Sequence, residues 1–360
     1  MSKRYNFSPG PGVLFKDVLE KVQKSFLNWN NTGHSILELN HRSKEFETLL
    51  VGATKALRKL AEIPDNFDII FIQGGATQVF SSIPLNFCEE SDTVDYIVNG
   101  YWSKFAAEEA TKFANVNICN NDLSYNDCPK QSSLKISPNA KYVHYCSNET
   151  INGCEFKYVP DVGEIPLICD MSSNFLSKPI KNIQKYGMIY AGCHKNIGPP
   201  GMVVVIIRED MLNKFRNKIP LLLNFTEMRN KCSILNTPPV FNIYFASLTF
   251  EHMLKIGGLK VIENKNKEKA TILYDAIEQS DGFYIYDMNP LCRSIMNIPF
   301  RIKTAKYERL FLEKAKEYGL DGLDGHPSVG HCRVSLYNAM PIEGVLKLTE
   351  FMKIFYLMCK

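Results

Sequence analysis

A chain of 360 residues exceeds the size of one compact core and predicts two domains, or one large domain with a smaller one appended. With 45% hydrophobic and 22% charged residues the composition is globular, and the net charge of +4 is spread along the chain without a basic tract, which argues against a nucleic-acid partner. The apolar runs fall short of the ~18 residues that a membrane-spanning helix needs, and the N-terminus carries no apolar signal core, so we expect neither a membrane span nor a secretory signal.

The cysteines indicate a reducing environment. The chain has 11 of them, an odd number, at wide spacing and without a CxxC pair. Disulfide frameworks and zinc sites usually show paired or closely spaced cysteines. We therefore expect free thiols, several of them buried as small apolar residues, no bound metal, and a cytoplasmic protein.

The first elements along the chain are a turn-rich segment and two helices. Residues 1–15 contain SPGPG, which predicts an irregular N-terminal segment. Apolar residues recur at helical spacing over 15–29 and over 41–63, and Ser43 fits an N-cap of the second helix.

Six short apolar segments come next and alternate with helical stretches. They are residues 68–72, 95–100, 142–146, 166–170, 187–192 and 202–208. They are apolar on both faces and rich in β-branched residues, as strands covered by helices on both sides should be. This alternation predicts an α/β domain with a largely parallel sheet.

Beyond about residue 258 the pattern changes. The expected elements are helices over 259–279 and near 307–319 and 342–358, with isolated strands at 295–302 and 332–336. Such an order predicts a smaller α+β domain. We therefore divide the chain into a large α/β domain at 16–258 and a small C-terminal α+β domain at 259–360, joined by the segment 1–15.

A lysine stands where a buried strand ends. In YAGCHKNIGPPG, residues 190–201, Lys195 lies among glycines and other small residues that let the backbone approach a ligand closely. A lysine in such a place is most often a solvated loop residue. Its amine becomes nucleophilic when burial or a nearby cation lowers its pKa, and a carbonyl cofactor could then hold it as a Schiff base.

Three further features follow the ends of strands. Asp170 ends LICD, where it could cap a helix or pair with the pyridinium nitrogen of pyridoxal phosphate. Gly75 in IQGGATQ could belong to an ordinary turn or to a phosphate site at a helix N-terminus. Trp102 in NGYWSK could be a packing residue or could stack on a planar cofactor. A phosphate cradle, a stacking ring, a carboxylate and a lysine in that chain order together indicate a pyridoxal phosphate site.

Ordered segments over nearly the whole chain carry a family resemblance. They are NFSPGP, HRSKEFE, FIQGGATQVF, GYWSKFAAEEA, NETINGCEF, CDMSSNFLSKPI, YAGCHKNIGPPG, LNTPPVFNIY, MNIPFRI and GHPSVGHCRVSLYNAMP. On these segments the chain resembles the phosphoserine aminotransferases, class V aminotransferases of the fold-type-I pyridoxal phosphate enzymes. The resemblance implies a mainly parallel seven-stranded sheet flanked by helices, a smaller α+β domain, and a homodimer with shared active sites.

The resemblance also implies roles for individual residues. Lys195 is the implied Schiff-base lysine and proton shuttle, Asp170 the partner of the ring nitrogen, and Trp102 the stacking ring, and these three are the implied catalytic residues. The implied cofactor contacts are Gly75, Ala76, Thr77, Trp102, Thr150, Asp170, His194, Lys195, Asn236 and Thr237. The implied substrate contacts are His41, Arg42, His326 and Arg333.

For six of these residues the resemblance implies a specific binding role or a location in the other subunit. Arg333 would grip the substrate α-carboxylate, for which a guanidinium fork is suited, and His326 would face the distal anionic group. The residues implied to come from the other subunit are Asn236, Thr237, His41 and Arg42.

Departures from the family pattern concern anion binding. His194 stands where the family usually has a glutamine beside the lysine, and the charge of a histidine depends on pH. Pro327 stands where the family has an arginine expected to hold the substrate phosphate, and His331 replaces a glycine. Losing one charged donor to a dianion costs about 1.5–3 kcal/mol, or roughly ten- to a hundredfold in binding. We therefore expect these departures to affect substrate preference and catalytic efficiency more than the fold or the cofactor.

The resemblance implies a transfer of the amino group of L-glutamate to 3-phosphohydroxypyruvate, giving O-phospho-L-serine and 2-oxoglutarate in serine biosynthesis. One alternative is an aminotransferase of altered acceptor specificity, which Pro327 would explain. Another is a weakly active paralogue that acts by binding a partner, although Lys195, Asp170, Trp102 and Arg333 are all present. In each case we expect small-molecule substrates or a protein partner, and neither nucleic acid nor a membrane.

Overall fold

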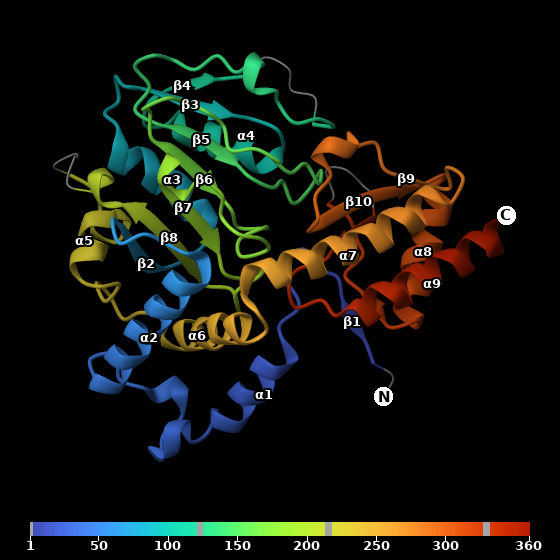
Figure 1. Cartoon of the computed structure of the whole chain (residues 1–360), viewed down its shortest axis with the longest axis horizontal. Coiled ribbons are helices and arrows are strands. Elements are labelled where there is room, and N and C mark those ends of the chain that lie inside the picture. Colours follow the sequence, from blue (N-terminus) through green and yellow to red (C-terminus); the bar gives the residue numbers. More distant parts are fainter. Residues whose placement is uncertain (1–2, 121–124, 213–217, 327–331) are drawn as a thin grey trace.

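The computed structural model describes residues 3–120, 125–212, 218–326 and 332–360. Pro327 and His331 lie outside the described residues. Within them, a seven-stranded sheet forms the centre of the larger part of the molecule (Figure 1). Its strands, in spatial order, are β2 (Phe67–Gln73), β8 (Met202–Arg208), β7 (Tyr186–Gly192), β6 (Leu167–Asp170), β5 (Val143–Cys146), β3 (Thr93–Ile97) and β4 (Asn115–Ile118).

The sheet is mainly parallel, which confirms the predicted α/β class. The strands β7, β6, β5, β3 and β4 run in the same direction, whereas β8 is antiparallel to both β7 and β2. The six predicted strands all lie in this sheet. The seventh, β4, escaped prediction because its sequence NVNI alternates with asparagine and lies at an exposed edge, without the apolar run of a covered strand.

Helices cover both faces of the sheet because its strands are apolar on both sides. In β8, Val203, Val205 and Ile207 pack on one side, and Val204 and Ile206 pack on the other. The first face is covered by α3 (Ala76–Phe87), α4 (Tyr101–Ala110) and α5 (Phe225–Asn230). The second face is covered by α2 (Lys44–Ala61) and α6 (Val240–Lys255), and α1 (Lys16–Ser25) packs on α6. We call this part, from β2 to β8 with its covering helices, the sheet unit.

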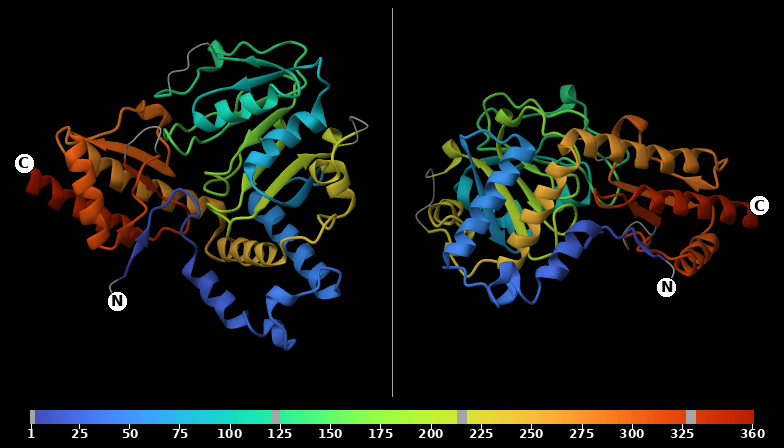
Figure 2. Two further views of the ribbon diagram at one scale, coloured as in Figure 1. Left: turned by 180° about the vertical axis from the view of Figure 1, so that it is seen from behind. Right: turned by 60° about the horizontal axis from the view of Figure 1, so that its bottom comes forward.

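A second, smaller core lies beside the sheet unit (Figure 2). Its antiparallel sheet has the order β12 (Cys332–Ser335), β10 (Asn297–Ile302) and β9 (Tyr284–Ile285). It packs with α8 (Ala305–Glu317) and α9 (Ile342–Cys359), while β1 (Tyr5–Asn6) pairs in parallel with β11 (Leu320–Asp321). We call these elements the terminal unit, because they come from both ends of the chain.

Helix α7 (Gly258–Glu278) contributes residues to both cores. Leu259 and Ile262 near its start belong to the core of the sheet unit, whereas Leu273 and Ile277 near its end belong to the core of the terminal unit. The predicted division of the chain at residue 258 therefore falls at the start of a shared helix, and it stays a prediction.

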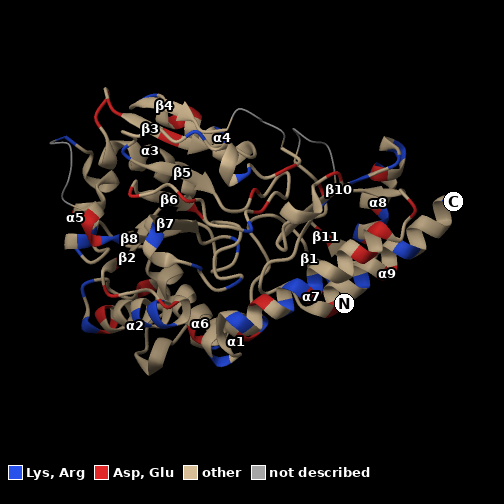
Figure 3. Cartoon of the chain, turned by 45° about the horizontal axis from the view of Figure 1, so that its top comes forward, with Lys and Arg blue, Asp and Glu red and all other residues tan. Residues whose placement is uncertain are grey.

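Basic and acidic residues are interspersed along α2, α7 and α8, in keeping with the even spread of charge in the sequence (Figure 3). Among the helices of the described residues, none is both long and apolar enough to cross a membrane.

Candidate active site

The loops that follow the parallel strands converge at one edge of the central sheet. Thr150 follows β5, Asp170 is the last residue of β6, and Lys195 lies in the turn after β7. In the sheet register Cys146 lies opposite Asp170, which lies opposite Tyr190. Because the carboxyl ends of parallel strands meet at the same edge, residues far apart in the sequence become neighbours here.

A cavity of about 340 Å³ opens at this edge. The predicted residues that line it are Gly75, Ala76, Thr77, Trp102, Thr150, Asp170, His194, Lys195, His326 and Arg333. The terminal unit contributes Arg333, and the N-terminal segment contributes Pro9 and Gly10. The cavity is therefore assembled from parts of the chain that only the tertiary fold brings together.

Lys195 is buried in the wall of this cavity. Its Nζ donates a 2.8 Å hydrogen bond to Thr150 Oγ1 and lies 5.9 Å from the centroid of the Trp102 ring. Burial lowers the pKa of Lys195 to about 8, against the opposing effect of nearby carboxylates, Asp170 foremost. An amine with this pKa is partly unprotonated near neutral pH and can act as a nucleophile or as a base.

The Asp170 carboxylate is held at the edge of the same cavity. It accepts a 2.7 Å hydrogen bond from the Ser172 backbone N–H. Burial raises the pKa of Asp170, against hydrogen bonds from Ser172 and Tyr190 that lower it. A buried carboxylate beside a cavity is suited to pair with a cationic group of a bound ligand, because such a partner relieves its desolvation.

Trp102 lies in the first turn of α4, and a buried glutamate fixes this helix start. Glu149 accepts hydrogen bonds from the Trp102 N–H at 3.0 Å, the Ser103 N–H at 2.7 Å and Ser103 Oγ at 2.7 Å. It thereby satisfies N–H groups that have no partner within the helix. The indole Nε1 of Trp102 is buried and has no hydrogen-bond partner within the described residues. Sequence reasoning missed Glu149, although it stands directly before Thr150 in NETINGCEF.

The start of α3 offers a place for an anion. Gly75 is its N-cap, without a side-chain cap, and Ala76 and Thr77 are its first helical residues. A Cβ at Gly75 would meet no described atom within 4 Å, so the space beside this backbone is open. Exposed N–H groups at a helix start favour phosphate. Burial lowers the pKa of His194, in the same cavity, to about 4, so this imidazole is neutral at pH 7.

Arg333 reaches the cavity from β12. Its side chain is buried, and its Nε has no hydrogen-bond partner among the described residues. Burial lowers the pKa of Arg333, yet a guanidinium remains charged at any physiological pH. A buried cation with an unused donor is suited to a carboxylate. His326 lines the same cavity, with its ring 5.5 Å from that of Tyr101.

Four predicted residues lie away from this cavity. His41 and Arg42 precede α2, and Arg42 is exposed. Asn236 and Thr237 are exposed beside the end of β2, where Asn236 donates a 3.0 Å hydrogen bond to Gln73 Oε1 and the Thr237 carbonyl accepts one from Gln73. These are the residues implied to serve the other subunit's site, and that role stays a prediction.

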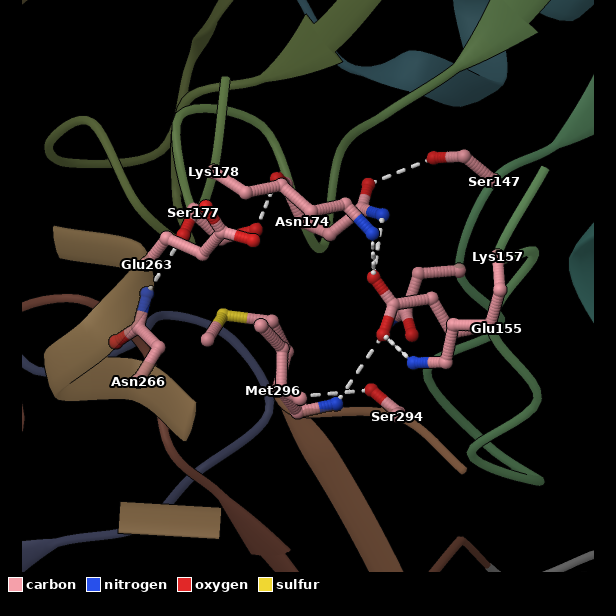
Figure 4. Close-up of polar contacts among 12 residues, drawn as sticks. Ser147, Glu155, Lys157, Asn174, Ser177, Lys178, Glu263, Asn266, Ser294 and Met296 are labelled. Atoms are coloured by element: carbon pink, nitrogen blue, oxygen red, sulfur yellow. Dashed lines mark hydrogen bonds and ion pairs between the residues drawn. The ribbon is translucent and has the colours of Figure 1, made fainter. Parts of the chain in front are cut away.

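A polar network ties the back of the site to the terminal unit (Figure 4). Glu155 is fully buried and pairs with Lys157 at 2.6 Å and with Lys178 at 2.5 Å, and it accepts a 3.3 Å hydrogen bond from the Ile295 N–H. Although burial raises it, the two lysines bring the pKa of Glu155 down to about 2. The network holds the loop that carries Thr150 against the unit that carries Arg333.

The residues of the cavity fit pyridoxal phosphate. The open start of α3 suits the phosphate, Asp170 suits a pyridinium nitrogen, and the Lys195 amine suits a carbonyl carbon. The buried Nε1 of Trp102 and Nε of Arg333 are donors that a ligand in the cavity could satisfy. Among the described residues, no group of three or more His, Cys, Asp or Glu side chains is arranged to hold a metal ion.

Comparison with known proteins gives a consistent assignment. Residues 4–348 match the family model of the class-V aminotransferases. The chain is 44% identical to phosphoserine aminotransferase 1, chloroplastic, of Arabidopsis thaliana, over 98% of this chain and 82% of that protein. It is also 44% identical to the phosphoserine aminotransferase of Chromobacterium violaceum, over 99% of each chain.

Solved structures agree with these relatives. The fold matches phosphoserine aminotransferase from Bacillus circulans subsp. alkalophilus with a TM-score of 0.97 and 38% identity, over 100% of both chains. It matches a pyridoxal phosphate-bound phosphoserine aminotransferase from Trichomonas vaginalis with a TM-score of 0.93 and 40% identity, over 98% of this chain and 100% of that one. The chain belongs to the class-V aminotransferases, in the family of the phosphoserine aminotransferases.

Proposed function

We propose that this protein uses pyridoxal phosphate to transfer the amino group of L-glutamate to 3-phosphohydroxypyruvate, giving O-phospho-L-serine and 2-oxoglutarate. The observation that carries the proposal is the convergence of Lys195, Asp170, Trp102 and Arg333 on one cavity, in a chain 44% identical to phosphoserine aminotransferases. When bound, the cofactor supplies a carbonyl that takes up the amino group and a ring that stabilises negative charge on the substrate. The residues that would hold it are Gly75, Ala76, Thr77, Trp102, Thr150, Asp170, His194 and Lys195.

Lys195 is the base of the reaction. Its Nζ, with a pKa of about 8, takes the proton from the Cα of glutamate and, in the second half of the reaction, returns a proton to the Cα of phosphoserine. Thr150 Oγ1 accepts a hydrogen bond from this Nζ and keeps the amine in the cavity wall. Asp170 would pair with the pyridinium nitrogen of the bound cofactor, because a nearby carboxylate favours the charged form of that nitrogen.

Both acidic substrates carry an α-carboxylate and a second anionic group. Arg333 binds the α-carboxylate, because its buried guanidinium has an unused Nε donor and the fork geometry matches a carboxylate. His326 lies in the same cavity and faces the distal carboxylate or phosphate. Because Arg333 is buried, its charge interaction with a bound carboxylate is stronger than it would be in open water.

We further infer a homodimer in which His41, Arg42, Asn236 and Thr237 complete the partner's site. The inference is supported by their positions away from the cavity of their own chain. Mixing Arg42→Ala with Lys195→Ala protomers tests it, since mixed dimers restore one complete site and recover activity that neither variant has alone. A monomer by light scattering, or no recovery on mixing, would remove the inference.

We also place the protein in the cytoplasm. The 11 free cysteines support this, because a reducing compartment keeps thiols unpaired. Cell fractionation of the tagged protein checks the assignment, and recovery from an oxidising compartment would contradict it.

The test of the activity is a substrate panel on the purified holoenzyme, with its visible spectrum recorded. We expect 3-phosphohydroxypyruvate to be preferred over unphosphorylated 2-oxo acids, and Lys195→Ala to abolish turnover and change the cofactor absorbance. Lys181→Ala, a change at an exposed lysine outside the cavity, is the matched control and should act like the wild type. If the enzyme prefers an unphosphorylated acceptor, its substrate is not 3-phosphohydroxypyruvate. Turnover that survives Lys195→Ala would contradict the proposed role of Lys195.

A further inference from the structure

A second cavity, of about 540 Å³, lies behind the strand ends that carry the active site. At the end of β5, Cys146 lines the active-site cavity, whereas Tyr145 and Ser147 line the second cavity. At the end of β6, Asp170 lines the active-site cavity and Met171 lines the second one. Neighbouring residues of an extended segment point to opposite sides, so the two cavities share these strand ends as a common wall. We call the second cavity the rear cavity.

Positive charge is in excess around the rear cavity. Five lysines but only two glutamates are among the described residues that line it. The buried Glu155 pairs with Lys157 at 2.6 Å and with Lys178 at 2.5 Å, and Figure 4 shows both ammonium groups directed at its carboxylate. Glu155 therefore offsets only one of the two positive charges beside it.

The second glutamate is arranged in the same way. Glu263, near the start of α7, pairs with Lys260 at 3.0 Å and with Lys267 at 2.6 Å. Lys260 and Lys267 are exposed, and an ammonium group has three donors, so each can also bind an anion in the cavity. Like charges gathered around one cavity repel one another, and a bound anion would relieve that repulsion.

The rest of the lining favours an organic anion over an inorganic one. Tyr158, Val159, Ile180 and Ile295 line the rear cavity and are half-buried. An inorganic ion would leave this apolar surface in water, whereas the apolar body of an organic ligand would cover it. The volume also lies within the roughly 300–1,000 Å³ that small-molecule sites occupy. A small ligand with an apolar body and two negative charges, one for each pair of lysines, matches both the charge and the walls.

Hydrogen bonds connect the rear cavity to the wall of the active site. Asn174 Nδ2 donates a 3.4 Å hydrogen bond to Glu155 Oε1, and Asn174 Oδ1 accepts one of 2.6 Å from Ser147 Oγ. The Ser147 N–H in turn donates a 3.0 Å hydrogen bond to the Asp170 carbonyl. Glu155 also stands in the loop that carries Thr150. The groups that hold lysines of the rear cavity are thus connected to Asp170 and Thr150.

We propose that the rear cavity is an effector site for a small organic dianion, held by its two pairs of lysines and its apolar wall, and that the bound dianion strengthens cofactor binding across the common wall. The dianion joins the loop after Thr150, the segment after Asp170 and the start of α7. Fixing these segments lowers the ordering cost that remains when pyridoxal phosphate binds. By linkage, the bound cofactor strengthens binding of the dianion by the same factor.

The rear cavity is separate from the active site and from the surface inferred to face the other subunit. None of the described residues that line the active-site cavity also lines the rear cavity. The residues inferred to complete the partner's site do not line it either; they are His41, Arg42, Asn236 and Thr237. A substrate and the effector can therefore be bound at the same time.

The experiment titrates 1-naphthyl phosphate, an aromatic dianion near neutral pH, into the full-length holoenzyme in a calorimeter. The active-site cavity of the holoenzyme already holds the cofactor, which leaves the rear cavity open to the probe. We expect one molecule of probe to bind per chain. Binding should be at least about tenfold weaker for 1-naphthol, which lacks the charge, and for inorganic phosphate, which lacks the apolar body.

A double variant locates the bound probe. Lys157→Gln with Lys260→Gln removes one ammonium group from each pair, so that each glutamate keeps one lysine partner. We expect it to weaken binding of the probe by at least about tenfold. Lys16→Gln with Lys112→Gln is the matched control, because it removes two exposed lysines that pair with glutamates outside the cavity, and it should bind the probe as the wild type does.

The effect on the cofactor is measured by its release. The pyridoxal phosphate that remains on the protein after timed dialysis is read from its absorbance, with and without the probe. We expect the probe to slow release about fivefold in the wild type and to have no effect on the variant Lys157→Gln with Lys260→Gln.

Several results would overturn the inference. A wild type that does not bind the probe, or a double variant that binds it equally well, removes the site. Binding that is lost in Arg333→Ala but kept in Lys157→Gln with Lys260→Gln places the probe in the active site and has the same consequence. A probe that binds without slowing release removes the effector role. Neither measurement involves turnover, so failure of the proposed function and failure of this inference are separate results.

Discussion

The start of α4 depends on a single carboxylate, and replacing it should displace the ring expected to stack on the cofactor. Glu149 is fully buried and accepts from the Trp102 N–H, the Ser103 N–H and Ser103 Oγ. Glu149→Ala removes the acceptor for both backbone donors at once. Glu149→Gln keeps one carbonyl oxygen but turns an NH2 group toward the remaining donors.

The size of the effect follows from these contacts. A hydrogen bond to a charged group contributes about 1.5–3 kcal/mol, and the loss of a helix N-cap costs about 0.5–2 kcal/mol. The hydroxyl of Ser103 retains the Gly100 carbonyl as a partner, so its loss of Glu149 adds little. We expect Glu149→Ala to lower the free energy of unfolding by about 3 kcal/mol and Glu149→Gln by about half of that.

The chain allows the displacement of the ring to be observed directly, because Trp102 and Trp29 are its only tryptophans. Trp29 packs in a separate core near Tyr244, with ring centroids 6.3 Å apart. In a Trp29→Phe background, the fluorescence of the cofactor-free protein reports Trp102 alone. Glu149→Ala should shift this emission to the red, increase its quenching by acrylamide, and weaken by about tenfold the quenching by added pyridoxal phosphate.

A matched control separates the carboxylate from the rest of the helix start. Ser103→Ala leaves both backbone donors paired with Glu149 but removes the acceptor of the Asn99 and Gly100 N–H groups, which lie 3.0 and 3.1 Å from Ser103 Oγ. It should therefore lower the urea midpoint while changing the Trp102 emission far less than Glu149→Ala does. If Glu149→Ala left the emission maximum and the urea midpoint of the Trp29→Phe protein unchanged, the carboxylate would not position Trp102.

Three further predictions concern stability, each measured by urea unfolding. The folded pKa of Lys195 is about 8, against about 10.5 in the unfolded chain, so between these pH values the unfolded chain binds more protons at this lysine. The free energy of unfolding should therefore rise with pH over this range. Lys195→Met should remove up to about 3 kcal/mol of that rise in a pH series. Glu155 has a folded pKa of about 2, below its usual 4.5, so its contribution is present above pH 4.5 and should be lost as the pH falls toward 2, whereas Glu155→Gln should flatten this acid dependence. Gly153→Ala should lower the free energy of unfolding by more than about 2 kcal/mol, because Gly153 has a positive φ and an added Cβ would meet packed atoms. Gly163 also has a positive φ but lies in open space, so Gly163→Ala should lower it by only about 1 kcal/mol. Equal costs for the two alanine variants, or a pH slope that survives Lys195→Met or Glu155→Gln, would contradict the respective explanation.

The periodicity of apolar residues was sufficient to predict most helices and strands. It failed for elements that are buried on all sides and for one that is exposed. The predicted strands and the long helix α7 were found because their apolar residues follow a strand or helix period. No helix was predicted over Val240–Lys255, because α6 is buried against α1 on one side and α2 on the other and so has no polar face to mark a period. The edge strand β4 was missed for the opposite reason, since its exposed residues form no apolar run.

The sequence alone determined the α/β class and the placement of Lys195, Asp170, Trp102 and the Gly75 turn at strand ends, because hydrophobic periodicity and chain order are local properties. Only the tertiary structure decided which of these residues share a cavity, and that Arg333 and the N-terminal segment join them. The same holds for Glu149 beneath Trp102 and for the lysines that gather around the rear cavity. The ionisation of Lys195 and His194 also depended on the fold, because a pKa is set by burial and by neighbouring charges that come from distant parts of the chain.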